Sequence, residues 1–495
     1  MKKFITKTII VTLITVGFSA CSDEYFDVNT PSNGVDLDEL NMKNLMGPVI
    51  HSTFFAQQSA EAVFGNYTQY FGSYGSGAAG KTQNSSTWDQ VYLYILPNLK
   101  VIKEKSQAKE AKHFFAIASI LEAINIGLAA DSWDNIPYSQ AIQGIENTHP
   151  SYDSQEQIYA QIFTLLDSAI SALEAADNSQ VSLGKEDLVY GGDKEKWLRA
   201  AYTFKARFQL HLMNKGVVTA NDVLASIEKG FTSNSDNFKM SFPEDKINPW
   251  YSTNILSRKT GNFYRAPNDQ LISNMNGTTY PFESGVVQID PRLPAIFVKE
   301  GNADDPWRGF MNGGEGESSD GEDANTYYKD GGYHTTAGAP LILLTYAEAM
   351  FIKAEAAFLA NSGTTTSIGS NSDAYIAYQN GISASMAEVG VDGADYMADT
   401  AIDVGEGSLM LNHIMKEKYV ANIHNVETYN DMRRYNFSSD VFKGLALRLE
   451  VDTDDDEFKG KWFRRAIYPT SEKNANETVV NANWQEPTVS VWWAQ

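Results

Sequence analysis

The sequence predicts a mainly α-helical protein with one large loop-rich part. Two observations lead to this fold class. Five stretches place apolar residues three and four positions apart, which is the spacing of a buried helical face. Between the third and fourth stretch, roughly residues 230–335 are rich in Gly, Pro, Asn, Asp and aromatic residues and show little helical period. A hydrophobic content of 43%, with 9 Trp, 25 Tyr and 25 Phe, is enough for a large buried core.

The first 20 residues have the pattern of a bacterial lipoprotein signal peptide. Three lysines precede a short apolar run at 9–16, and Phe18-Ser19-Ala20-Cys21 follow it. The run is shorter than the roughly 20 residues that span a bilayer, which argues against a transmembrane helix. Cys21 is the single cysteine of the 495 residues, so no disulfide can form within the chain. We expect cleavage before Cys21 and attachment of fatty acyl chains such as palmitate, which would hold the protein at a membrane surface.

Residues 21–36 predict a turn-rich, lipidated tether before the folded body. Asp23 and Glu24 resemble the acidic signal that sends lipoproteins of the Bacteroidetes across the outer membrane, so we expect the protein to face the cell exterior. The formal net charge is −23, and the chain without its first 20 residues has 36 basic against 62 acidic residues. Because nucleic-acid binding needs clustered Lys and Arg, this balance argues against a nucleic-acid partner.

The helices are predicted in chain order from their apolar faces. They cover residues 109–130, 155–176, 197–212, 341–359 and 409–423. Ser154, with Gln157 three residues later, predicts the cap that opens the second helix. Paired amphipathic helices suit a helical-repeat scaffold. We expect a single domain over 37–495, with a helical scaffold at about 37–229 and 336–450 and a loop-rich half at about 230–335 and 451–495.

Six segments spread along the chain carry a family resemblance. They are Tyr25 to Thr30, Asp131 to Ala141, Gly191 to Trp197, Leu344 to Ala356, Ile414 to Tyr419 with Asp431 to Arg434, and Arg464 to Pro469 with Glu472 and Asn476. Together they resemble the SusD/RagB family of nutrient-binding outer-membrane lipoproteins, in its SusD-like branch. One departure is Asp134-Asn135, where many relatives have Gly-Asp. The resemblance implies a helical body of tetratricopeptide-like helix pairs packed against a loop-rich, ligand-binding half.

Most residues of these segments are interpreted as structural. Trp133 and Tyr138 are expected to cover the end of the first predicted helix, where Pro137 closes the following loop. Glu348 and Glu355 lie seven residues apart on one helix face, so we expect them to form buried ion pairs or capping contacts rather than to act in catalysis. The candidate partners are Arg433, Arg434, Arg464 and Arg465.

The sequence does not support an enzyme or a metal protein. Gly75 to Thr82 fits the phosphate-loop pattern, but polar and aromatic residues precede it and Gln83-Asn84-Ser85-Ser86 follow it, so we interpret it as a flexible loop. No H-E-x-x-H, second cysteine or G-x-S-x-G is present. Asp452 to Glu457 lacks the glycine that an EF-hand loop needs at its sixth position. We expect no cofactor and no metal, while a pair of glycosidase carboxylates is a spatial arrangement that stays open.

Aromatic residues set among Asn, Asp and Gly in loops are the candidate ligand-binding residues. Sugars have apolar C–H faces ringed by hydroxyls, so flat rings flanked by short polar side chains suit them. Trp88 lies at helical spacing with Tyr92, which favours a core position, whereas Trp250 and Trp307 fit packing and stacking equally well. The candidates are Tyr70, Tyr74, Trp88, Trp250, Tyr251, Trp307 and Tyr328, which follows Tyr327.

The resemblance also implies a function and a partner. It implies a non-enzymatic surface lipoprotein that captures an oligosaccharide and passes it to a TonB-dependent outer-membrane transporter of the SusC type. A peptide or glycoprotein ligand is the alternative within binding proteins, since some relatives serve peptide uptake. A surface glycoside hydrolase is the alternative from another class.

Overall fold

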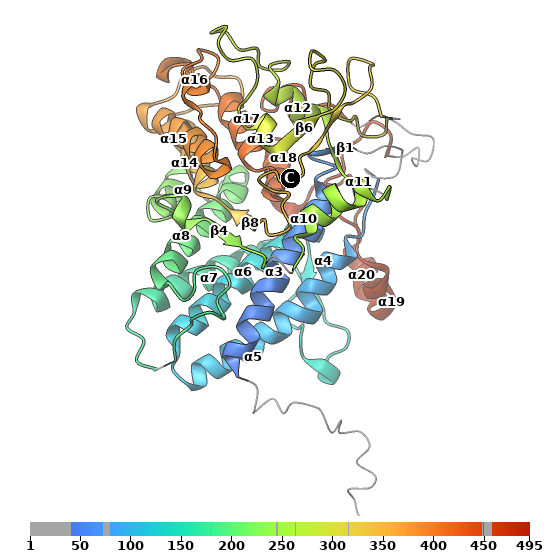
Figure 1. Ribbon diagram of the computed structural model, residues 1–495. Coiled ribbons are helices and arrows are strands. Elements are labelled where there is room, and N and C mark those ends of the chain that lie inside the picture. Colours follow the sequence, from blue (N-terminus) through green and yellow to red (C-terminus); the bar gives the residue numbers. More distant parts are fainter. Residues whose placement is uncertain are drawn as a thin grey trace, which may run out of the picture.

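The computed structural model describes residues 41–72, 80–179, 181–243, 246–262, 264–314, 316–447, 449 and 458–495. Predictions that concern Cys21, Tyr74 and the acidic run 452–457 lie outside the described residues. The described chain is mainly helical with a few short strands, which confirms the predicted fold class (Figure 1). Long helices fill the lower part of Figure 1, and the upper part combines further helices with loops and short strands.

The helical half is a row of neighbouring antiparallel helices. Pairs α5 and α6, α6 and α7, α7 and α8, and α8 and α9 lie side by side. Its elements are α3 (Met42–Phe64), α4 (Ser85–Asp89), η1 (Gln90–Ile95), α5 (Leu96–Ala108), α6 (Lys112–Trp133), α7 (Gln155–Glu174), α8 (Lys194–Leu212), η3 (Met213–Lys215) and α9 (Ala220–Ile227). The predicted helices at 109–130, 155–176 and 197–212 correspond to α6, α7 and α8. Ser154 and Gln157 form the predicted capping box at the start of α7.

Helix α6 is the centre of this half. It is long and apolar enough to cross a membrane by length and composition alone, but 89% of its most apolar stretch is buried inside the protein. Neighbouring α3, α5, α7 and α8 all contact it. It is therefore the core helix of a globular body.

The second helical group continues the row from α9. It comprises α14 (Tyr346–Ala360), α15 (Ser372–Val389), α16 (Ala394–Met397), η6 (Glu406–Ser408), α17 (Leu411–Ala421) and α18 (Glu427–Arg434). The helix expected from 341 begins at Tyr346, because Thr345 caps it by accepting the backbone N–H of Glu348. The four apolar residues before the cap instead form strand β8 (Leu341–Leu344), which pairs with β4 (Phe238–Met240).

The region expected to be loops is built from short elements, as predicted. These are η4 (Asn234–Asp236), α10 (Pro249–Tyr251), η5 (Ser252–Leu256), α11 (Ser257–Lys259), β5 (Ala266–Pro267), α12 (Asp269–Met275), α13 (Leu293–Ile296), β6 (Phe297–Lys299) and β7 (Thr326–Tyr328). β5 pairs antiparallel with β1 (Phe71–Gly72), and β6 pairs with β7. The remaining elements are β2 (Ile136–Pro137), η2 (Gly144–Glu146), β3 (Tyr152–Asp153), α19 (Thr470–Ala475), α20 (Glu477–Asn483) and η8 (Trp492–Ala494).

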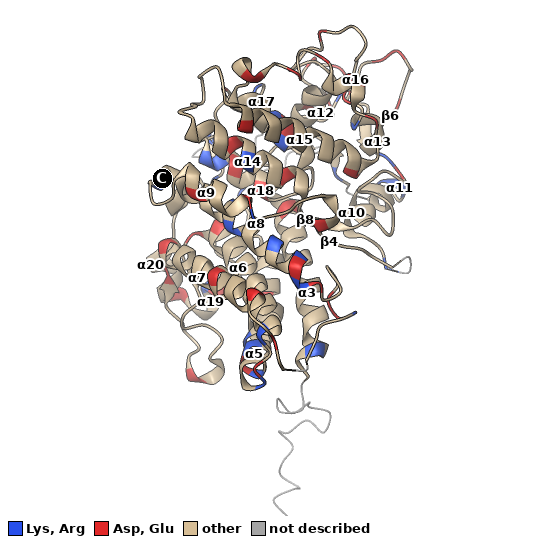
Figure 2. Ribbon diagram, turned by 90° about the vertical axis from the view of Figure 1, so that its left-hand side faces the viewer, with Lys and Arg blue, Asp and Glu red and all other residues tan. Residues whose placement is uncertain are grey.

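Buried ion pairs join α14 to its neighbours. The predicted pair between Glu355 and Arg434 is present at 2.6 Å. Glu348 pairs with Arg207 of α8 at 2.7 Å, so the expected partner for this glutamate was wrong. Arg433 instead donates to the backbone carbonyl of Asp131 and covers the ring of Trp493. In the view of Figure 2, basic positions are scattered among acidic ones.

Candidate functional site

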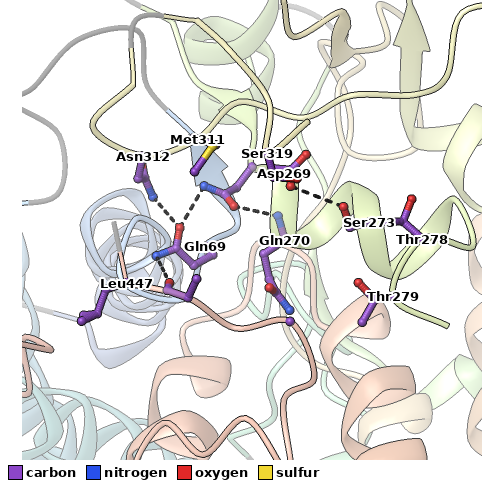
Figure 3. Close-up of a pocket in the computed structure, with 13 residues that line it drawn as sticks. Gln69, Asp269, Gln270, Ser273, Thr278, Thr279, Met311, Asn312, Ser319 and Leu447 are labelled. Atoms are coloured by element: carbon purple, nitrogen blue, oxygen red, sulfur yellow. Dashed lines mark hydrogen bonds between the residues drawn. The ribbon is translucent and has the colours of Figure 1, made fainter. Parts of the chain in front are cut away.

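A pocket of about 210 Å³ lies where loops from distant parts of the chain meet (Figure 3). Five segments build it: the turn after α3, the start of α12, the loop after α12, the loop between β6 and β7, and the loop after α18. The lining residues are Gln69, Asn268, Asp269, Gln270, Ser273, Thr278, Thr279, Met311, Asn312, Ser319, Gly444, Ala446 and Leu447. The pocket thus combines four amides, four hydroxyls, one carboxyl group and a small apolar surface.

The side-chain amides of Gln69, Asn268 and Asn312 bond to one another, and Gln270 joins this network through its backbone N–H, which donates to Asn268 Oδ1. Gln69 Oε1 accepts from Asn268 Nδ2 at 2.9 Å and from Asn312 Nδ2 at 3.1 Å. Gln69 Nε2 donates to the carbonyl of Ala446 at 3.3 Å, and Gln270 Nε2 donates to that of Lys443 at 2.9 Å. The network ties the turn after α3 to α12 and to both later loops, so it fixes the shape of the pocket.

Local sequence explains why these residues lie here. Asn268 is the N-cap of α12, and its Oδ1 accepts the backbone N–H of Gln270 at 2.9 Å. Gln69 has a positive φ of 59°, which turns the chain sharply between α3 and β1. The hydroxyl of Tyr419 on α17 donates to the carbonyls of Thr68 and Gln69 and holds this turn.

A close backbone approach completes the wall. A Cβ atom at Gly309 would lie 2.5 Å from the backbone of Asn268, so no larger residue fits at position 309 unless one of the two backbone segments moves. The adjacent Phe310 forms a parallel bridge to Asn268 and accepts the backbone N–H of Asp269 at 3.1 Å. This contact positions the loop that contains Met311 and Asn312.

Asp269 is the single charged side chain among the described lining residues. Its carboxyl oxygens accept from Ser318 Oγ at 2.5 Å and from Ser273 Oγ at 3.4 Å. Two cations on the loops that build the pocket are engaged elsewhere: Lys443 lies over the ring of Tyr280, and Arg308 pairs with Asp320 at 2.6 Å. The pocket therefore has a polar, weakly acidic lining.

A second cavity of about 330 Å³ lies on the helical half, between α5, α6 and the loop at 138–142. Its polar groups bond to one another: Glu122 accepts from Lys103 at 2.5 Å and from Tyr138 at 2.8 Å. Lys100 donates to the carbonyl of Ile142. We take the amide-lined pocket as the candidate site, because it combines neutral amide and hydroxyl side chains from five segments, whereas charged groups line the second cavity, and Lys103 and Glu122 among them pair with each other.

The structure corrects four of the predicted aromatic residues. Tyr70 is 0% exposed, Trp88 5%, Trp250 2% and Tyr328 2%, so their rings are core. A ring without an accessible face cannot stack on a sugar in this conformation. Trp88 packs edge-on against Trp133, and Trp250 packs against His424.

Two predicted aromatic residues are half-buried, and neither lines the amide-lined pocket. Tyr251 lies on α10. The backbone carbonyl of Trp307 accepts a hydrogen bond from the side chain of Asn276. Asn276 directly follows α12, two residues before the lining residue Thr278. Asn276 Oδ1 in turn accepts the backbone N–H of Thr278 at 2.9 Å. This arrangement puts the backbone of Trp307 near the loop after α12.

The pocket amides were missed by the sequence reasoning. Gln69 directly precedes a candidate residue, and Asn268 stands before Asp269 as an N-cap would, which are the two signals that the sequence offered. Gln270 and Asn312 have no such signal. Within the described ranges, no group of three His, Cys, Asp or Glu side chains is arranged to hold a metal ion.

Fold and site together define a mainly helical protein with a pocket built from loops. Comparison with known proteins identifies the family. The family model described as SusD-like, starch-binding and associating with the outer membrane matches residues 35–492, and the chain belongs to this family. No curated protein sequence matches the chain.

Solved structures with the same fold come from the Bacteroidetes. A SusD/RagB family protein from Bacteroides thetaiotaomicron has 23% sequence identity and a TM-score of 0.68, covering 92% of this chain and 99% of its own. A chitin-binding SusD homologue from Flavobacterium johnsoniae has 20% identity and a TM-score of 0.70, covering 92% and 98%. A SusD homologue from Bacteroides uniformis has 21% identity and a TM-score of 0.69, covering 92% and 98%. The predicted family and fold are confirmed.

Proposed function

We propose that this chain is a surface lipoprotein that binds an oligosaccharide in the amide-lined pocket and delivers it to a TonB-dependent transporter of the SusC type. The observation that carries the proposal is the network of Gln69, Asn268, Gln270 and Asn312 beside four hydroxyl side chains in one pocket. Amides and hydroxyls are the groups that hydrogen-bond sugar hydroxyls. The family description as starch-binding and a structural neighbour named as chitin-binding support a glycan ligand.

Outer-membrane association follows the family description, and lipid attachment at Cys21 is the means we propose for it. The transporter partnership rests on the resemblance of the chain to SusD-like proteins. Chemical cross-linking of outer membranes, followed by mass spectrometry, should recover a β-barrel transporter with the chain. Recovery of the chain as a free monomer under every cross-linking condition would count against delivery.

The number of carboxyl groups among the described lining residues favours a binding role over hydrolysis. Glycosidases use a pair of carboxyl groups about 5–10 Å apart across the scissile bond. The described residues that line the pocket supply one, Asp269. Incubation of the purified protein with labelled oligosaccharides should leave them intact, whereas cleavage products would favour the hydrolase.

The binding site is tested by two matched amide substitutions. A soluble form beginning at Ser22 is first screened on a glycan array, and the tightest ligand is measured by calorimetry. Gln270→Ala should weaken binding by about 1–3 kcal/mol, because Gln270 positions the wall formed by the loop after α18. Gln107→Ala, in the cavity on the helical half, is the control and should leave affinity unchanged. If Gln107→Ala weakens binding and Gln270→Ala does not, the ligand binds in the cavity on the helical half. Peptide binding without glycan binding would favour the peptide alternative.

A further inference from the structure

The orientation of every amide in the pocket is determined by a backbone group. Asn312 Nδ2 donates to the carbonyl of Asn66 at 2.9 Å, and Gln69 Nε2 donates to that of Ala446. Gln270 Nε2 donates to the carbonyl of Lys443, while Asn268 Oδ1 accepts a backbone N–H. A carbonyl can accept and an N–H can donate, so rotating any of these amides by 180° would break a bond.

This arrangement uses part of the pocket's N–H donors internally. Asn312 Nδ2 makes two bonds, to the carbonyl of Asn66 and to Gln69 Oε1, whereas Gln69 Nε2, Asn268 Nδ2 and Gln270 Nε2 make one bond each to the described residues. Six backbone N–H groups around the pocket also bond to protein acceptors, those of Asn268, Asp269, Gln270, Thr278, Thr279 and Met311. Because an amide NH2 group carries two N–H donors, Gln69, Asn268 and Gln270 each keep one that no described residue accepts and that can donate to a ligand.

The pocket also offers acceptors and hydroxyls to a ligand. Gln270 Oε1 accepts no hydrogen bond from the described residues and lies beside Gly444, where a Cβ would be 3.4 Å from it. Asn312 Oδ1 is buried beside the pocket without a donor. Asp269 adds a carboxyl group, and Thr279 and Ser319 add hydroxyls that can either donate or accept.

We propose that the pocket selects neutral sugars and rejects anionic sugars such as uronates and sulfated sugars. This inference rests on the proposed glycan-binding function. A sugar hydroxyl can donate to Gln270 Oε1 and to the carboxyl group of Asp269, and it can accept from the remaining amide N–H groups. A sugar carboxylate or sulfate would lose water and face the charge of Asp269, with no Lys or Arg among the described lining residues to pair with it.

The test compares neutral and anionic glycans on the same protein. The soluble form is screened at about 150 mM salt on an array of neutral, uronate-containing and sulfated oligosaccharides. Calorimetry then compares the tightest neutral ligand with its uronate counterpart. We expect the uronate to bind about tenfold more weakly or worse. A uronate or sulfated glycan that binds as tightly as the best neutral one would overturn the inference while leaving glycan binding intact.

Two substitutions with the same charge change sharpen this test. Asp269→Asn should reduce the neutral-to-uronate affinity ratio by about threefold or more, because it removes the pocket's charge. Asp395→Asn, at an exposed position on α16, changes the net charge equally and should leave the ratio unchanged. Equal ratios in wild type and Asp269→Asn would contradict the assigned role of Asp269. If no array glycan binds at all, the proposed function itself fails.

Discussion

Tyr70 and Tyr419 bond to each other's backbone segment. The hydroxyl of Tyr70 donates to the carbonyl of Tyr419 at 2.6 Å, and the hydroxyl of Tyr419 donates back to the carbonyl of Gln69 at 2.9 Å. Their rings stack with centroids 4.6 Å apart. Helix α17 therefore holds the turn from which Gln69 enters the pocket.

Tyr419→Phe should lower both stability and ligand affinity. The substitution leaves the carbonyls of Thr68 and Gln69 without their donor in a buried site, which costs about 1–3 kcal/mol. Urea unfolding monitored by tryptophan fluorescence measures the loss. Tyr94→Phe removes a hydroxyl from a residue that is 52% exposed and should change neither quantity. Equal free energies of unfolding for the two variants would show that the hydrogen bonds of the Tyr419 hydroxyl contribute no stability.

Trp307→Ala and Trp250→Ala should separate ligand binding from core packing. Trp307 is half-buried near the pocket, so its loss should weaken glycan binding by about 1–3 kcal/mol and leave the melting temperature close to that of wild type. Trp250 is buried against Phe71 and His424, and its truncation should cost about 3–5 kcal/mol of folding free energy. Calorimetry measures the glycan affinity of both variants, and thermal melting measures their stability. Full affinity in Trp307→Ala would remove this ring from the site.

Glu61→Gln should stabilise the protein by an amount that grows with pH. Both carboxyl oxygens of Glu61 are buried without hydrogen-bond partners in the described chain, and burial raises the pKa of this carboxyl group well above its usual value. The unfolded chain ionises at about pH 4.5, whereas the folded protein holds the proton, so Glu61 reduces stability as the pH rises above 4.5. A permanently neutral glutamine avoids this loss.

The melting temperature of Glu61→Gln relative to wild type should therefore be higher at pH 7.5 than at pH 4.5. Glu104→Gln, at an exposed position on α5, is the control, and its difference from wild type should be similar at both pH values. A margin for Glu61→Gln that shrinks with rising pH would mean that the carboxyl group is ionised and paired in the fold.

Trp493→Ala should destabilise the whole protein although the residue lies two positions from the end of the chain. Its Nε1 donates to Asp131 on α6 at 2.8 Å, and its ring stacks on His211 of α8 at 5.1 Å. Loss of a buried Trp costs about 3–5 kcal/mol. The half-buried neighbour Trp492 provides the matched control, and Trp492→Ala should cost clearly less in the same unfolding experiment. Similar losses for the two variants would mean that the bond to Asp131 adds no stability.

Cys21→Ala should abolish lipid attachment, because the chain has no other cysteine to form the thioether. Cells fed a labelled fatty acid provide the measurement, with membrane and soluble fractions compared. Glycan affinity of the purified protein should be unchanged. Label on the variant, or its retention in the membrane fraction, would disprove the lipoprotein prediction.

The helices were predictable because their signals are local. The apolar face of α6 and the cap formed by Ser154 depend on residues within a few positions of each other. The exception is the apolar run at Leu341–Leu344, which pairs as a strand with Phe238–Met240, about 100 residues away. An apolar run of that length suits a strand and a buried helix equally, and only the distant partner decides.

The site was less predictable because burial in loops is set by distant contacts. Trp250 is buried by His424, and Tyr70 by Tyr419, so the sequence around either ring does not report its exposure. The pocket amides are ordinary Asn and Gln residues until the fold brings Gln69, Asn268 and Asn312 together. The candidates Trp250 and Tyr328 come from the loop-rich sequence, yet their rings are part of the core.

The pocket joins segments that begin at Gln69 and end at Leu447, so it is an assembly of nearly the whole chain. A fragment that does not span residues 69–447 lacks at least one of its walls, and a chain that has formed its helices without docking the later loops has no site. Ligand binding is therefore a reporter of completed folding. By mass action, a saturating ligand should protect every part of the structure against global unfolding at once, including helices far from the pocket.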